Sequence, residues 1–159
     1  MEILDEFKDK TPIFACIGTK KSFYDNTSNR IGYILKENGF NVVLNLNSVN
    51  MQNKLKILEK IQNKIENSFV IAIDLSVSEN RKSVIPYKIS KSGIKPGSFL
   101  NKEHKELGDV SIKIFVDYFE KVENDFDVLE VICKSNGNKK IHEIEKEIAN
   151  KLINYYKNK

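Results

Sequence analysis

The sequence predicts an α/β protein, a three-layer α/β/α sandwich with a mostly parallel central sheet. Short continuous apolar segments, typical of strands covered on both faces, alternate with longer segments whose apolar residues recur at helical spacing. Over the first half of the chain the order is strand, helix, strand, helix, strand, and such units form parallel sheets with right-handed crossovers. The length of 159 residues suits a single domain, residues 1–159, with a sizeable core.

The first half contains the clearest elements. In order, we expect a strand at 13–18, a helix at 30–38, a strand at 40–46, a helix that Asn50 caps and that extends to residue 67, and a strand at 69–74. Gly39 follows the first helix, where glycine commonly ends a helix. The second helix has an apolar stripe at positions 55, 58, 61 and 65.

The second half begins with a segment that contains a proline. Residues 84–90 alternate weakly and include Pro86, which predicts a strand at an edge of the sheet because proline cannot donate a backbone hydrogen bond. A loop rich in glycine and proline follows at 92–99. We expect further strands at 110–118 and 126–133. A last helix at 139–156 should bury Ile141, Ile144, Ile148, Leu152 and Tyr155.

Charge composition argues against a nucleic-acid partner. The net charge is +4, and lysine supplies nearly all of the basic residues, since the only arginines are Arg30 and Arg81. Proteins that bind bases and phosphates commonly use the planar donor fork of arginine. We therefore expect no nucleic-acid partner.

Cysteine usage and the absence of long apolar runs predict a cytoplasmic protein. Cys16 and Cys133 each lie in an apolar, strand-like segment, which is typical of free thiols in a reducing compartment, although a disulfide between them stays open. Residues 1–10 include four acids and lack the apolar stretch of a signal peptide. No apolar run approaches the roughly 18 residues that span a membrane, so we expect no membrane partner.

Asp25 and Asp74 are the strongest candidates for a site. Asp74 follows the apolar run V-I-A-I, so we expect it to be partly buried at the carboxyl end of a central strand, with backbone amides of the loop at 18–25 as donors. Right-handed crossovers make the first and third strands neighbours, and ligands of open parallel sheets bind beyond the carboxyl ends of the strands. Two carboxyl groups in one dry site can serve as an acid and a base, because their pKa values separate.

A structural interpretation of the same two acids stays open. Asp25 precedes the first expected helix, where an aspartate can cap the helix or complement the positive end of its dipole. Asp74 could mark the point at which its strand reaches solvent.

Other kinds of site have weaker support. The first loop contains Gly18 but neither of the glycine-rich phosphate motifs, so Lys20 and Lys21 are expected in a solvated loop, with anion binding as an alternative. Neither cysteine has a histidine nearby in sequence, which argues against a thiol nucleophile. His142 falls on the polar side of the last helix. His104 could complete a metal site with two acids, but a surface histidine is the simpler interpretation.

Three sequence blocks resemble a known family. They are I-A-I-D at 71–74, S-G-I-K-P-G-S-F at 92–99 and L-G-D-V-S-I at 107–112, with C-I-G-T at 16–19 in the place of the family's opening motif. Together they resemble the YyaC-like sporulation proteins, which are related to the germination protease of spore-forming bacteria. The resemblance covers residues 12–118.

The resemblance implies the three-layer fold of hydrogenase maturation peptidases and a peptidase-like activity in sporulation or germination, on a protein or peptide substrate in the mother cell or forespore. It places the two essential aspartates of the germination protease on Asp25 and Asp74. The substrate loops correspond to Gly18, Thr19, Gly93, Pro96 and Gly97. The related hydrogenase peptidases bind a metal with two acids and a histidine, which here would be Asp25, Asp74 and His104. We expect no cofactor, but a divalent metal stays open.

The chain departs from the family pattern around the first acid. Lys20 stands where the family has an acid, Tyr24 stands where it has glycine, and N-T-S-N at 26–29 includes Ser28 instead of a Leu-Gly-Pro segment. Loss of glycine can keep the backbone from approaching a substrate closely. Two hypotheses follow: a peptidase in which the two aspartates activate water, or a catalytically degraded relative that binds or assembles other proteins during spore formation.

Overall fold

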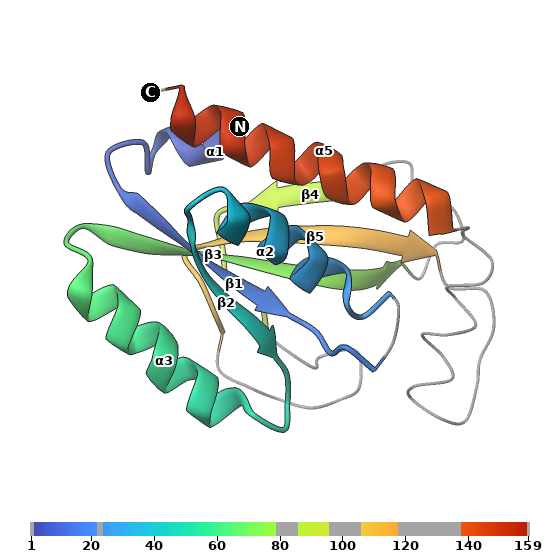
Figure 1. Ribbon diagram of the computed structural model, residues 1–159, viewed down its shortest axis with the longest axis horizontal. Helices are drawn as coiled ribbons and strands as arrows, with labels where there is room; N and C mark the ends of the chain where they lie inside the picture. The colour runs from blue at the N-terminus through green and yellow to red at the C-terminus, as the bar shows by residue number, and fades with distance from the viewer. Residues whose placement is uncertain (1, 22–23, 79–85, 96–105, 118–137, 159) are drawn as a thin grey trace.

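A computed structural model describes residues 2–21, 24–78, 86–95, 106–117 and 138–158, and its helices and strands alternate along the chain (Figure 1). The elements are α1 Glu2–Asp5, β1 Thr11–Ile17, α2 Thr27–Glu37, β2 Asn41–Leu46, α3 Met51–Lys64, β3 Ser68–Ser78, β4 Tyr87–Ser90, β5 Val110–Asp117 and α5 Asn138–Lys157.

The sheet has five strands in the order β2-β1-β3-β5-β4. The four strands β2, β1, β3 and β5 are parallel, while β4 runs antiparallel to β5 at the edge. This confirms a mostly parallel sheet, the adjacency of the first and third strands, and the edge position of the strand that follows Pro86. The strand expected at 126–133, which includes Cys133, lies outside the described residues.

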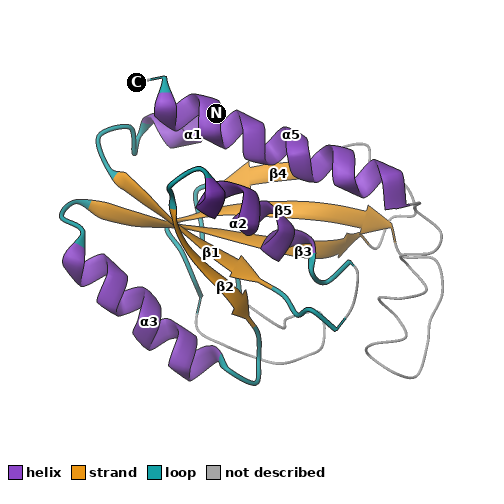
Figure 2. Cartoon of the chain, viewed as in Figure 1, coloured by secondary structure: helices purple, strands orange, loops and turns teal. Residues whose placement is uncertain are grey.

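Helices cover both faces of the sheet, as the three-layer prediction requires (Figure 2). One core contains Leu4 of α1, Ile31 and Leu35 of α2, and Ile148 and Leu152 of α5, packed on one face of β1, β3 and β5. We call this face the α5 face. The opposite core joins residues of α3 to Ile13, Ala15, Val70, Ala72, Ile94 and Leu107, and we call that side the α3 face.

The assignment of each strand residue to a face follows the period of two in a strand. On β3, Phe69, Ile71 and Ile73 belong to the α5 face, whereas Val70 and Ala72 belong to the α3 face. The next residue of the even-numbered series is Asp74, which therefore lies on the α3 face.

Two close contacts hold helices in place, one between α5 and α1 and one between α2 and β1. Tyr155 of α5 donates a hydrogen bond of 2.6 Å to Asp5 of α1, so the two ends of the chain lie side by side (Figure 1). Gly32 of α2 faces the buried Cys16, and a Cβ atom there would lie 2.6 Å from its Sγ atom. Burial of the Cys16 thiol raises its pKa far above the ordinary value, which fits a packing role.

Several helix ends differ from the sequence expectation. Helix α2 begins at Thr27 rather than residue 30, and α3 ends at Lys64 rather than 67. The early start of α2 is possible because polar side chains of its first turn are buried and hydrogen-bonded. Asn50 precedes α3 as predicted, but its side chain bonds within the preceding loop, to the amide of Asn47 and the carbonyl of Asn45, instead of capping the helix. Gly39, with a φ of +88°, follows the end of α2 as predicted.

Candidate active site

The first acid is held by a loop that folds back on the end of β1. Gly18 follows the strand directly, and its amide donates to the carbonyl of Leu46 in β2 over 2.8 Å. The amide of Thr19 donates to the carboxylate of Asp25 over 2.9 Å. A Cβ atom on Gly18 would lie 2.0 Å from the carbonyl oxygen of Asp25, so only glycine permits this approach.

The residues that depart from the family pattern support this loop. Tyr24 is 1% exposed and belongs to the core on the α5 face. Ser28 is fully buried, and its hydroxyl donates to the carbonyl of Ile17. The ammonium group of Lys20 lies 5.6 Å from the ring centroid of Tyr33 on α2. Tyr24 and Ser28 thus anchor the loop, and Lys20 is directed to the surface of α2.

The second acid is not at the end of its strand, which corrects the sequence expectation. Asp74 lies within β3, which continues to Ser78 because β5 pairs with it as far as Ser78 and Asp117. The polar residues after Asp74 alternate with Leu75 and Val77 and so extend the strand. Strand β1, however, is paired with β3 only as far as Cys16 and Ile73. Asp74 is therefore the first residue of β3 beyond the last pair with β1, beside the loop that begins at Gly18.

The two acids interact, and both have raised pKa values. Burial raises the pKa of Asp25 to about 6, against the opposing effect of the Thr19 amide. Burial raises the pKa of Asp74 to about 8, and the negative charge of Asp25 acts in the same direction. The Leu75 amide, which donates to Asp74, and the positive charge of Lys113 oppose that rise.

The donors differ from those predicted. Asp74 receives its backbone hydrogen bond from Leu75, the next residue in its own strand, rather than from the loop at 18–25. Nor does Asp25 hold the capping position of α2, which Asn26 occupies. The expectation that Asp25 caps the helix is therefore wrong, whereas the interaction of its carboxylate with the helix dipole stays a prediction.

The two sequence blocks around residues 93 and 108 pack together on the α3 face. Ile94 and Leu107 exchange two backbone hydrogen bonds of 2.8 and 2.7 Å. Gly93 allows this contact, since a Cβ atom there would lie 2.5 Å from the Leu107 carbonyl. The amide of Val70 donates to the Asp109 carboxylate over 2.8 Å, which fixes the segment to β3 four residues before Asp74.

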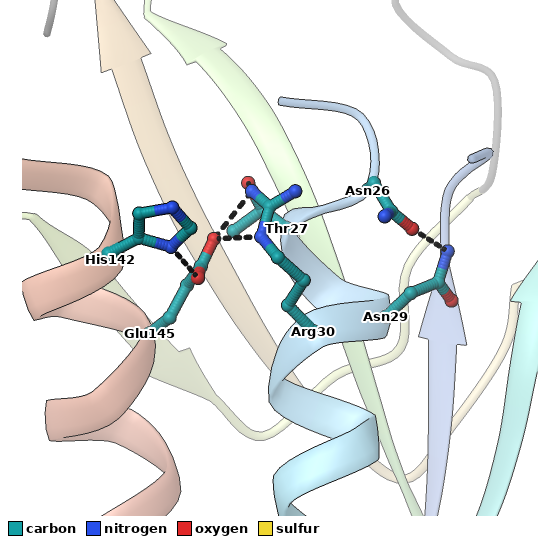
Figure 3. Close-up of polar contacts among 6 residues, drawn as sticks. All are labelled: Asn26, Thr27, Asn29, Arg30, His142 and Glu145. Carbon is teal, nitrogen blue, oxygen red and sulfur yellow. Dashed lines mark hydrogen bonds and ion pairs between the residues drawn. The ribbon is translucent and has the colours of Figure 1, made fainter. Parts of the chain in front are cut away.

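A buried ion pair, which sequence reasoning missed, anchors helix α2 (Figure 3). Arg30 of α2 donates to Glu145 of α5 over 2.6 and 2.8 Å, and also to Thr27 over 3.1 Å. His142 lies 2.8 Å from the other carboxylate oxygen of Glu145, and its side chain is half exposed, as expected for the polar side of the helix. The pairing joins residues 115 positions apart, a separation that a helical pattern does not reveal.

Asparagine side chains form hydrogen bonds between α2 and the end of β2, and sequence reasoning missed these as well. Asn29 is fully buried and exchanges hydrogen bonds with Asn45, donating to its side chain over 3.0 Å and accepting from its amide over 2.8 Å. Asn45 has a φ of 58°, a conformation that asparagine tolerates better than most residues. A cluster of asparagines at 45, 47 and 50 was the available signal.

The described residues bring together two carboxyl groups that could serve as metal ligands. Within the described ranges no group of three or more histidine, cysteine, aspartate or glutamate residues could hold a metal ion. His104, Pro96 and Gly97 lie outside the described residues. The chemistry available to the described part of the site is therefore that of two adjacent carboxyl groups.

The fold and the paired acids define an α/β protein with a candidate acid–base site beside the end of β1. The chain belongs to the family described as "Protein of unknown function (DUF1256)", whose model matches residues 1–151. It is 32% identical over 123 residues to the uncharacterized protein YyaC of Bacillus subtilis (strain 168). That match covers 69% of this chain and 58% of the relative. The sequence resemblance to YyaC-like proteins is thus confirmed.

The chain also has a distant match to a solved structure. It is the [NiFe] hydrogenase maturation protease HybD from Thermococcus kodakarensis, with a TM-score of 0.46 and 17% sequence identity. The match covers 87% of this chain and 99% of that one.

Among the described residues, no helix combines the length and the apolar character needed to cross a membrane.

Proposed function

We propose that the chain is a peptidase-like hydrolase in which Asp25 and Asp74 share one proton and activate water for attack on a peptide bond. The observation that supports this most is the electrostatic coupling of two partly buried acids whose pKa values are raised to different extents. Between about pH 6 and 8, Asp25 is then mainly ionised while Asp74 mainly keeps its proton.

The proposed roles follow from these protonation states. Asp25 acts as the general base and takes a proton from water as the water oxygen bonds to the peptide carbonyl carbon. Asp74 acts as the general acid and gives its proton to the amide nitrogen as the carbon–nitrogen bond breaks. The products are a new carboxyl group and a free amine, and transfer of the proton from Asp25 back to Asp74 completes the cycle.

The surroundings of the acids support an enzyme more than a degraded relative. The three unusual residues lie in supporting positions: Tyr24 in the core, Ser28 on the Ile17 carbonyl and Lys20 over Tyr33. A buried carboxyl group with a raised pKa costs stability at neutral pH, and such arrangements are common at functional sites. We propose that the substrates are proteins or peptides of the sporulating cell, from the resemblance to the YyaC-like proteins.

The test is proteolysis by the purified protein. Protein extract from sporulating cells is incubated with wild type, Asp25→Asn, Asp74→Asn and the exposed control Asp9→Asn between pH 5 and 9, with and without divalent metals, and new peptide termini are identified by mass spectrometry. We expect wild type and Asp9→Asn to give the same fragments, with a maximum between pH 6 and 8. Each site variant should lose at least about 100-fold in rate. Absence of fragments from wild type under all conditions, or fragments that persist in both site variants, contradicts the proposal.

A further inference from the structure

Beside Asp74, a row of charged residues crosses three neighbouring strands on the α3 face. Asp74 of β3 is in register with Lys113 of β5, and Lys113 is in register with Lys88 of β4. Ile112 and Ile114 of β5 belong to the α5 face, and so do Tyr87 and Ile89 of β4, so the two lysines lie on the opposite face with Asp74.

The two lysines form a like-charged pair directly across an antiparallel ladder. Such pairs are unfavourable unless an opposite charge lies between or beside them. In the described part of the chain, no carboxylate lies within ion-pair distance of either lysine. Even with Asp74 ionised, the row of three carries one net positive charge. One further negative charge would therefore neutralise the row.

A buried hydroxyl group adjoins the lysine pair. Ser111 precedes Lys113 by two residues on the same face of β5 and is in register with Ser90 of β4. Its side chain is fully buried, and its hydroxyl oxygen has no hydrogen-bond partner among the described residues. Buried hydroxyl groups are normally hydrogen-bonded, so an unpaired one beside two lysines indicates a missing acceptor.

We propose that Lys113 and Lys88, with the hydroxyl group of Ser111, form a subsite for a carboxylate of the substrate. Two ammonium groups would balance its charge and the hydroxyl could donate to one of its oxygens. The inference rests on the proposed function, because it names the class of peptide that the acid pair would cleave: one that carries an acidic side chain or a free C-terminus close to the scissile bond.

Strand geometry sets the distance between the subsite and the acid pair. Neighbouring strands lie about 4.8 Å apart, so Lys113 and Lys88 lie roughly 5 and 10 Å from Asp74 across the sheet. An extended peptide advances about 3.3 Å per residue. The carboxylate should therefore be one to three residues from the bond that is cleaved.

Binding of three peptides tests the subsite without requiring cleavage. The probes are acetyl-Ala-Ala-Ala with a free carboxylate, its C-terminal amide, and acetyl-Ala-Asp-Ala-amide. Their Kd values are measured by NMR from the backbone amide shifts of the β4 and β5 residues. We expect at least one carboxylate peptide to bind about fivefold more tightly than the neutral amide, and this preference to weaken with salt. The two carboxylate probes distinguish a chain terminus from an acidic side chain.

Charge-removing variants identify the residues responsible. Lys113→Met and Lys88→Met should each reduce the preference for carboxylate, whereas Lys95→Met, an exposed lysine outside the row, should keep it. Lys88 is also exposed, so its variant tests the subsite even if Lys113→Met does not fold. Equal Kd values for all three peptides, or a preference unchanged in both row variants, overturns the subsite.

The results separate this inference from the proposed function. Carboxylate-selective binding by a protein that cleaves nothing supports the subsite and counts against the peptidase. Cleavage that ignores carboxylates supports the peptidase and overturns the subsite.

Discussion

At the scale of single residues, Gly18 determines where Asp25 lies. The glycine has a φ of +153°, and the Asp25 carbonyl occupies the space that a side chain would need. The loop can bring the Asp25 carboxylate to the end of β1 only because residue 18 has no Cβ atom. The close contact between Gly18 and Asp25 therefore shapes the site as well as the fold.

Gly18→Ala should therefore destabilise the protein by about 2–3 kcal/mol and displace the Asp25 carboxylate. Urea unfolding measures the stability, and the amide shift of Thr19, which donates to that carboxylate, reports the displacement. Gly39→Ala is a matched control, since Gly39 has a φ of +88° but no atom within 4 Å of the added methyl group. It should cost only about 1 kcal/mol of backbone strain. Equal losses in the two variants would contradict the steric account.

At the scale of elements, the position of α2 depends on its contact with α5. The first turn of α2 follows the Asp25 loop directly, and Arg30 joins that turn to the buried Glu145. The side chain of Glu145 is 4% exposed and that of Arg30 20% exposed. Removal of one partner of such a pair leaves the other charge poorly solvated.

Glu145→Gln should lower the free energy of unfolding by about 2–3 kcal/mol. Glu147→Gln removes the same charge from the same helix, but its side chain is 48% exposed and pairs with Lys151, so little change is expected. Chemical denaturation of both variants gives the comparison. If the two variants were equally stable, the α2–α5 pair could not be a determinant of the fold.

Most of the helices and strands could be predicted from the sequence, but some of their ends could not. Apolar periodicity identified β1, β2, α2, α3 and α5, because each buries one face or both in the cores. It placed the start of α2 three residues late, because Thr27, Ser28 and Asn29 are polar residues that are buried. It ended β3 at Asp74, because a charged residue in a strand looks like its end unless the neighbouring strand is known.

At the scale of the whole molecule, the sequence predicts those parts of the candidate site that strand order alone brings together. The crossover rule brings Asp25 beside Asp74, and their electrostatic coupling agrees with that. The lysine row depends on the register of β4 with β5, and the Arg30–Glu145 pair depends on helix packing. Neither contact leaves a pattern in the sequence, since each joins residues that are far apart in the chain.

The pH dependence of stability tests the site in the whole molecule. An aspartate with an ordinary pKa near 3.9 in the unfolded chain and about 8 in the folded protein holds a proton only in the folded state between these values. Folding is then favoured at low pH, and this contribution is lost as the pH rises toward 8. Asp25 contributes similarly, but only up to about pH 6.

Between pH 6 and 8, the contribution of the two acids to this pH dependence therefore comes mainly from Asp74. In wild type, the free energy of unfolding should fall across this interval by about 1–2 kcal/mol, less than the full linkage value because Asp74 is partly exposed. Asp74→Asn should remove most of this decline and be the more stable protein at pH 8.5, whereas the exposed control Asp9→Asn should follow wild type. Parallel curves for wild type and Asp74→Asn, measured by urea unfolding at half-unit steps of pH, would mean that Asp74 ionises normally in the folded protein and cannot serve as the acid of the pair.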